Sequence, residues 1–152
     1  MDLILWRHAE AEDAQGNDDL GRALTPRGRK QAARMAAWLK TKLPAKTRIL
    51  VSPAVRCQQT AKALGRKFKT LPELAPDGNG ESLLKAARWP DANEPVMIIG
   101  HQPTLGLVAA YLLSDTPQPW TIKKGGAWWI RSRNREDHAQ VVLQAVQSPD
   151  CL

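Results

Sequence analysis

Short apolar runs alternate along this chain with the start signals of helices. The runs span residues 3–6, 48–51 and 96–99, and each has the length of a strand buried on both faces. Thr25-Pro26 and Ser52-Pro53 each supply an N-cap residue followed by a proline, which suits the first position of a helix. Strands that alternate with helices pair in parallel and end at one edge of the sheet. We therefore expect an α/β fold, a three-layer sandwich in which helices flank a mostly parallel central sheet.

The C-terminal part of the chain has a different pattern. Residues 127–131 and 140–146 predict two strands, and Asn134 to Asp137 predict the turn between them. We expect this antiparallel pair at the edge of the sheet. No linker or repeat divides the sequence, so we expect a single domain over residues 1–152. The other expected elements are a strand at 68–71 and helices at 26–43, 53–64, 82–88 and 104–112.

The net charge of the 152-residue chain is +7, which favours anionic partners such as nucleic acid or phosphorylated molecules. Lysine and arginine are spread along the chain without a basic run or a nucleic-acid-reading motif, so we expect no nucleic-acid partner. No apolar run approaches the roughly 18 residues of a membrane span, and the chain enters a strand without a leader segment. We therefore expect a cytoplasmic protein without a membrane partner, in which Cys57 and Cys151 are free thiols.

Polar side chains follow the three apolar runs at the points where the strands are expected to end. Arg7 and His8 follow the first run, Ser52 and Arg56 the second, and His101 the third. Because parallel strands end at the same edge of the sheet, we expect these side chains to converge there, beside helix N-termini that attract anions. Arginine binds phosphate oxygens through paired N–H groups, and a neutral imidazole can attack phosphorus. The sequence therefore predicts a phosphate site with a nucleophilic histidine.

Four short motifs follow one another along the chain. They are Arg7-His8-Ala9, Leu24-Thr25-Pro26-Arg27-Gly28, the nine residues from Ser52 to Thr60, and Gly100-His101. In this order they resemble the motifs of the histidine phosphatase superfamily, also called the phosphoglycerate mutase-like superfamily: Arg-His-Gly, Leu-Thr-x-x-Gly, Ser-Pro-x-x-Arg-x-x-Gln-Thr and a second histidine. Ala9 stands where the family has glycine. The resemblance covers the chain from residue 3 to about residue 110 and implies a phosphoglycerate mutase-like fold.

Finer features narrow the resemblance to one subgroup. The chain is short, and Arg22 stands just before the second motif. Leu71-Pro72-Glu73-Leu74 precedes a glycine-containing loop, His101-Gln102-Pro103 opens a helix, and Ser148-Pro149 lies further on. These features are similar to the SixA-type phosphohistidine phosphatases of bacteria. The resemblance implies an enzyme that removes phosphate from phosphohistidine on a phosphotransfer domain or a sugar-transport phosphocarrier protein.

The resemblance also implies the roles of individual residues. His8 would be the nucleophile and would become phosphorylated. The other polar residues of the site would bind the phosphoryl oxygens: Arg7, Arg22, Ser52, Arg56 and His101. No cofactor is implied, and the three histidines lack the spacing of a metal motif, so we expect a metal-independent enzyme.

A general acid is the part of the family pattern that this sequence matches least. Glu73 is the candidate by position, and Glu81 is the next. The SixA-type resemblance implies no clear acid, which is chemically reasonable because an imidazole can leave phosphorus as a neutral group, whereas an alkoxide needs a proton. We therefore expect Glu73 to be structural.

Two other functions are open alternatives. A phosphatase of small phosphoesters or of other phosphoproteins would need Glu73 or Glu81 as an essential acid. A non-catalytic phosphate-binding module would not need the nucleophile together with the full arginine and histidine set. The intact set at residues 7, 8, 56 and 101 therefore favours an enzyme.

Overall fold

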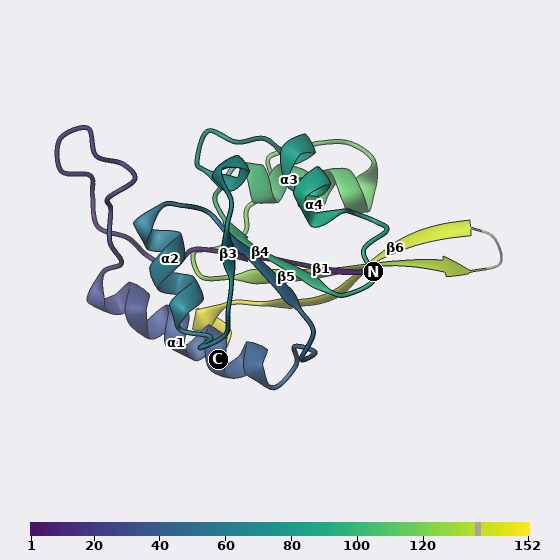
Figure 1. Cartoon of the computed structure of the whole chain (residues 1–152), viewed down its shortest axis with the longest axis horizontal. Helices are drawn as coiled ribbons and strands as arrows, with labels where there is room; N and C mark the ends of the chain where they lie inside the picture. The colour runs from purple at the N-terminus through teal and green to yellow at the C-terminus, as the bar shows by residue number, and fades with distance from the viewer. Residues whose placement is uncertain (136–137) are drawn as a thin grey trace.

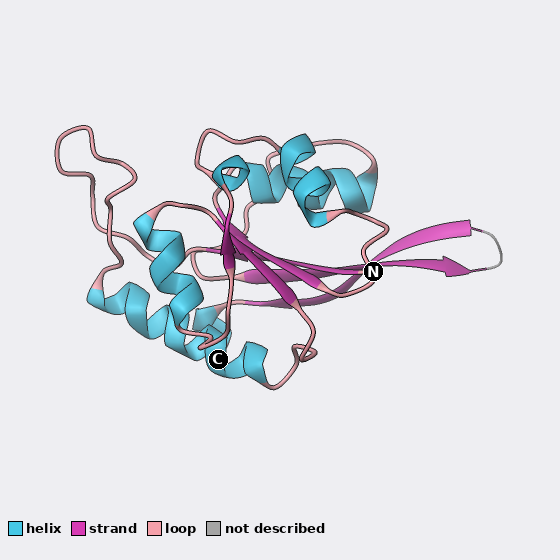
Figure 2. Ribbon diagram, viewed as in Figure 1, coloured by secondary structure: helices cyan, strands magenta, loops and turns pink. Residues whose placement is uncertain are grey.

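The computed structural model describes residues 1–135 and 138–152. Its centre is a six-stranded sheet in the order β3-β2-β4-β1-β5-β6. The strands are β1 (Asp2–Arg7), β2 (Arg48–Val51), β3 (Lys69–Thr70), β4 (Val96–Gly100), β5 (Ala127–Arg135) and β6 (His138–Gln147). The helices are α1 (Pro26–Lys40), α2 (Val55–Lys62), α3 (Gly80–Ala87) and α4 (Thr104–Ser114), with short 3-10 helices η1 (Pro72–Leu74) and η2 (Pro149–Cys151). Figures 1 and 2 show α1 and α2 on one face of the sheet and α3 and α4 on the other. No helix in the described part of the chain is long and apolar enough to cross a membrane.

The first four strands run parallel, whereas the two C-terminal strands run antiparallel to their neighbours. β1 pairs with β4, and β2 pairs with both β4 and β3. β5 pairs antiparallel with β1, and β6 pairs antiparallel with β5 and forms one edge of the sheet. The expected three-layer α/β sandwich, with a mostly parallel sheet and an antiparallel C-terminal pair, is therefore confirmed.

β1 divides the core in two, because successive side chains of a strand point to opposite faces of the sheet. Ile4 and Trp6 pack in the cluster formed with α1 and α2, whereas Leu3 and Leu5 pack in the cluster formed with α3 and α4. All four side chains are completely buried, and each aliphatic one contributes on the order of 1.5–3 kcal/mol by its burial. Trp6 Nε1 also donates to the carbonyl oxygen of Gly125 at 2.8 Å. The packing thus fixes the position of the segment that follows β1.

The two proline-marked helix starts have different local structures. α1 begins at Thr25-Pro26 as predicted, because the Thr25 hydroxyl caps the helix. The Ser52-Pro53 pair predicts a serine N-cap for α2, but the N-cap is Ala54. The Ser52 hydroxyl instead accepts from the Ala54 N–H at 3.2 Å and lies 2.7 Å from His101 Nε2. The correction matters for function, because Ser52 belongs to the group of side chains at the sheet edge.

Other element boundaries also differ from the prediction. β3 is only two residues long, and the expected loop after it contains η1. α3 begins at Gly80 instead of Ser82, because the Asn79 side chain caps it by accepting from the Ser82 N–H. β5 continues past residue 131, so Asn134 of the predicted turn lies in a strand. Residues 136 and 137 of that turn lie outside the described residues.

Candidate active site

The carboxyl ends of β1, β2 and β4 bring three polar side chains together. β4 lies between β1 and β2, and backbone bonds from His8 N–H to Gly100 O at 3.2 Å and from Ser52 N–H to Ile99 O at 3.1 Å continue the pairing. The ring centroids of His8 and His101 are 5.3 Å apart, and Ser52 Oγ lies next to the His101 ring. All three side chains are buried. The structure therefore assembles at one sheet edge the residues that the sequence predicts there.

His8 is 8% exposed and has a fixed ring orientation. Its Nδ1 lies 2.7 Å from the carbonyl oxygen of Ala9. A carbonyl oxygen only accepts hydrogen bonds, so Nδ1 carries the proton and Nε2 keeps its lone pair. Burial lowers the pKa of His8 to about 4; the Ala9 hydrogen bond opposes this shift, and the charges of Arg56 and Arg7 add to it. His8 is thus a neutral imidazole near pH 7, which is the form that can attack phosphorus.

Arg7 and Arg56 are anchored in the same way, because the Nη1 group of each donates to a backbone carbonyl oxygen. Arg7 Nη1 donates to the carbonyl oxygen of Ile122 at 2.8 Å, and Arg56 Nη1 donates to that of Asp19 at 2.8 Å. The Nε–H group of each arginine is buried and has no hydrogen-bond partner within the described residues. A buried unpaired N–H group costs roughly 1–3 kcal/mol, and more when the group is charged. The charges of both guanidinium groups act on the pKa of His8, so the two arginines are near enough to form an anion-binding pair with it.

His101 faces Arg56 with one ring nitrogen and Ser52 with the other. Its Nδ1 lies 3.3 Å from Arg56 Nη2, which can only donate, so Nδ1 accepts and Nε2–H donates to Ser52 Oγ. Burial, followed by the charge of Arg56, lowers the pKa of His101 to about 3. A bound phosphate dianion would act in the opposite direction and favour the protonated ring. His101 could then donate from both ring nitrogens.

Two residues of α2 support the site through long-range contacts. Thr60 Oγ1 accepts from the Ala9 N–H at 3.1 Å, and Gln59 Oε1 accepts from the Leu24 N–H at 2.7 Å. The end of the third motif thus ties the first two motifs to α2, and the polar Gln-Thr pair is the only sequence signal of this role. Cys57, expected to be a free thiol, is a free cysteine and is buried. Burial raises its pKa to about 12, so it is a thiol near neutral pH.

Arg22 lies in the loop at residues 11–24 and is connected to Arg56 through Asp19. Its Nε donates to the carbonyl oxygen of Glu12 at 2.7 Å, and its Nη1 donates to Asp19 Oδ1 at 3.3 Å. The other Asp19 oxygen, Oδ2, accepts from Arg56 Nη2 at 3.2 Å. Arg22 is therefore linked to Arg56 through a carboxylate. The sequence motifs do not single out Asp19, because it stands in a polar loop without periodicity.

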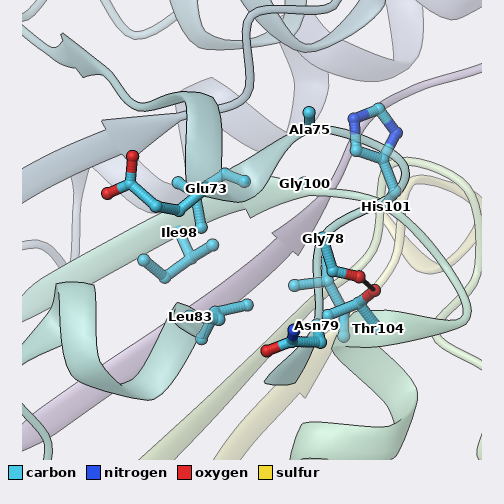
Figure 3. Close-up of a pocket in the computed structure, with 11 residues that line it drawn as sticks. Glu73, Ala75, Gly78, Asn79, Leu83, Ile98, Gly100, His101 and Thr104 are labelled. Atoms are coloured by element: carbon cyan, nitrogen blue, oxygen red, sulfur yellow. Dashed lines mark hydrogen bonds between the residues drawn. The ribbon is translucent and has the colours of Figure 1, made fainter. Parts of the chain in front are cut away.

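The two candidate general acids lie apart from this group. Glu73 is in η1 and lines a small cavity that His101 also lines, but Figure 3 shows its carboxylate directed away from the His101 ring. Glu81 is in the first turn of α3 and lines a separate surface groove with Tyr111. Both glutamate side chains are exposed. Within residues 1–135 and 138–152, no group of three or more His, Cys, Asp or Glu side chains is arranged to hold a metal ion.

Sequence comparison relates the chain to one protein family. Residues 3–77 match the sequence profile of the histidine phosphatase superfamily, branch 1. Phosphohistidine phosphatase SixA of Escherichia coli is 34% identical over 131 residues, which cover 80% of this chain and 80% of that protein. The SixA homolog of Haemophilus influenzae is 32% identical over 127 residues, which cover 74% of this chain and 77% of the relative.

Structural comparison points to the same family. The structure of the protein histidine phosphatase SixA complexed with tungstate superimposes with a TM-score of 0.74 at 27% identity. The superposition covers 99% of each chain. The similarity therefore includes the C-terminal strand pair, which lies beyond the residues matched by the family profile.

Proposed function

The chain belongs to the histidine phosphatase superfamily as a SixA-like member with the phosphoglycerate mutase-like fold, and we propose that it hydrolyses phosphohistidine. The substrate would be a phosphotransfer domain or a sugar-transport phosphocarrier protein, and the products would be the free histidine and inorganic phosphate. One observation carries the proposal: His8, held by the Ala9 carbonyl oxygen in the tautomer whose Nε2 is unprotonated, is a neutral imidazole beside the positive charges of Arg56 and Arg7. The names of the SixA relatives and the bound tungstate of one of them support it.

The first step would transfer the phosphoryl group to the enzyme. His8 Nε2 attacks phosphorus, the P–N bond of the substrate breaks, and its electron pair returns to the leaving imidazole. Arg7, Arg56 and His101 bind the phosphoryl oxygens while negative charge shifts onto them. Stabilisation of that charge by groups already in position is where most of the rate acceleration is expected.

The second step would regenerate the enzyme. A water molecule attacks the phosphorus of phosphorylated His8, the P–N bond breaks, and inorganic phosphate leaves. The nitrogen that is released is again the unprotonated Nε2, because Nδ1 keeps its proton through the bond to Ala9 O. Two guanidinium groups supply the positive charge for both steps, so we propose that catalysis is independent of added metal.

The position of Glu73 favours phosphohistidine over a phosphoester. An alkoxide leaving from an ester needs a proton from an acid within hydrogen-bond reach, whereas imidazole can leave without one. The exposed Glu73 carboxylate points away from His101, and Glu81 lines another groove. Hydrolysis of small phosphoesters is therefore the second candidate function, and a binding module without catalysis is the third.

We expect Glu73→Gln to change the turnover of a phosphohistidine substrate by less than about threefold, against the 100-fold or larger loss typical of a missing general acid. The reason is that the exposed Glu73 carboxylate does not point toward the ring of His101. The measurement is kcat with phosphohistidine protein, with Glu81→Gln as the matched control. A 100-fold loss in Glu73→Gln alone would show that Glu73 is the acid.

The proposed function is tested by a paired assay of the intact chain in the presence of a metal chelator. One substrate is a phosphohistidine-bearing transfer domain and the other is an aryl phosphate. We expect kcat/KM for the phosphoprotein to exceed that for the aryl phosphate by about 100-fold, a difference of roughly 2.7 kcal/mol in transition-state binding.

Each other outcome selects one of the alternatives. A preference for the aryl phosphate would favour the phosphoester phosphatase and would require an acid that remains to be found. Binding of inorganic phosphate without turnover of either substrate would favour the non-catalytic module. Loss of activity in the chelator, restored by a divalent metal, would overturn metal independence.

A further inference from the structure

The Asp19 carboxylate lies between two arginines at the rim of the site. Its Oδ2 accepts from Arg56 Nη2 at 3.2 Å, and its Oδ1 accepts from Arg22 Nη1 at 3.3 Å. The Asp19 carbonyl oxygen also accepts from Arg56 Nη1 at 2.8 Å. A carboxylate in this position repels a phosphate dianion, because like charges at short range disfavour one another. We therefore expect the Asp19 carboxylate to have a favourable interaction that outweighs this repulsion.

The Asp19 side chain is available to a substrate. It is 52% exposed, whereas the Arg56 side chain that it contacts is only 4% exposed. An ionised carboxylate has about four acceptor positions, and the two arginines use one on each oxygen. Burial opposes ionisation, but hydrogen bonds from Arg22 and Arg56 outweigh it and lower the pKa of Asp19. The side chain is thus a carboxylate near neutral pH, with acceptor positions left on the solvent side.

We propose that Asp19 accepts a hydrogen bond from the ring N–H of the substrate's phosphohistidine and so makes the site selective for N-phosphates over phosphoesters. The inference rests on the proposed function. A phosphoryl group held by Arg56 places the rest of the substrate toward solvent, because His8 and Arg56 are buried and Asp19 is at the rim. A phosphoester has no ring N–H to offer, so with that substrate the carboxylate contributes only repulsion.

The hydrogen bond would assist the bond-breaking step directly. As His8 Nε2 attacks, the P–N bond breaks and its electron pair goes to the ring nitrogen that carried phosphorus. The other ring nitrogen keeps its proton, so the imidazole leaves as a neutral molecule. An acceptor such as Asp19 favours the protonated state of that nitrogen and holds the ring in the tautomer that leaves most easily, as a carboxylate does for histidine in a catalytic triad. No proton needs to come from Glu73 or Glu81.

A simpler role for Asp19 would be to position the arginines. Its carboxylate fixes one end of the Arg56 guanidinium group, which also contacts His101. Loss of positioning would reduce the turnover of every phosphorylated substrate in parallel. Loss of a contact to the imidazole would reduce only the turnover of phosphohistidine. The ratio of the two activities therefore separates the roles, and it is insensitive to partial misfolding.

The experiment compares the intact wild-type chain with Asp19→Asn, using a phosphohistidine-bearing domain and an aryl phosphate as substrates. Asparagine keeps the shape of the side chain and removes its charge. We expect the ratio of kcat/KM for phosphohistidine to kcat/KM for aryl phosphate to fall by about tenfold or more, the scale of one hydrogen bond to a charged group. Asp19→Glu should recover part of the ratio, because it restores the carboxylate.

Asp18→Asn is the matched control. Asp18 is in the same loop, but its carboxylate accepts from the Gly21 N–H and contacts neither arginine. We expect the ratio in this variant to equal that of the wild type. An unchanged ratio in Asp19→Asn would overturn the inference while leaving the proposed function intact. If both activities also fell by the same factor, Asp19 would be assigned to positioning of the arginines. A wild-type chain that does not cleave phosphohistidine would overturn both.

Discussion

Replacing His8 with alanine is expected to lower the turnover of phosphohistidine by about 10⁴-fold or more, the scale of losing a covalent nucleophile. The expectation follows from the state of the ring. His8 is buried and neutral, and its bond to Ala9 O leaves Nε2 as the unprotonated nitrogen. His101, the other histidine at this edge, engages both of its ring nitrogens with Ser52 and Arg56. It is therefore poorly placed to take over the attack.

The measurement is trapping of the phosphoenzyme by an alkaline denaturing quench, with label from a radioactive phosphohistidine substrate, followed by acid treatment of a second sample, together with kcat. Wild type should give a phosphoenzyme whose label is lost in acid, and His8→Ala should give none. His8→Ala should still bind inorganic phosphate, because the positive charges of Arg7 and Arg56 are retained, and this binding controls for folding. A labelled phosphoenzyme in His8→Ala would mean that another side chain is the nucleophile.

The location of the site could be predicted because its main signals are local in sequence. Each strand is a short apolar run, and each is followed at once by the polar residues in question, as with His8 after β1 and His101 after β4. Burial of such runs between helices forces a parallel sheet, and a parallel sheet forces their carboxyl ends together. The alternation of strands and helices predicts only that these side chains lie near one another. Their individual roles come from the family resemblance.

The contacts that tune the site could not be predicted in the same way. Asp19 is hydrogen-bonded to Arg56, which is 37 residues away in the sequence. The polar loop that contains Asp19 has no periodic pattern of apolar residues from which this contact could be predicted. Ser52 looked like a helix cap because serine before proline is a strong local signal, but its hydroxyl bonds to His101, 49 residues away. In both cases a long-range contact decides the role of a polar side chain.

The strand ends illustrate a different limit. The β5 segment from Arg131 to Arg135 is polar, so alternation of apolar side chains stops before the strand does. Pairing with β6 continues there through the backbone, from Arg131 opposite Val142 to Asn134 opposite Ala139. Figure 1 shows β5 and β6 extending beyond the rest of the sheet. A prediction that relies on alternating apolar residues cannot detect the part of a strand that lies outside the core.

Arg56→Ala is the second substitution with a large expected effect, a fall in kcat/KM of about 10³-fold, near the upper end reported for removing one preorganised donor to a transition-state anion. Arg56 is 4% exposed, and its Nη2 bridges Asp19 and His101. Alanine would remove both the positive charge and the several N–H donors of the guanidinium group. Lysine should not restore the activity, because a single ammonium group cannot contact Asp19, His101 and a phosphoryl oxygen in the same geometry.

The matched control for Arg56→Ala is Lys62→Ala, which removes an exposed positive charge from the same helix. We expect Lys62→Ala to retain kcat and KM, so that general weakening of electrostatic attraction can be set aside. Whether Arg56→Ala changes kcat or KM also tells what Arg56 does. A fall in kcat means that Arg56 interacts more strongly with the transition state than with the bound substrate, whereas a rise in KM alone means that it binds both equally. The second result would contradict the assignment of Arg56 to charge stabilisation during transfer and would leave that task to Arg7 and His101.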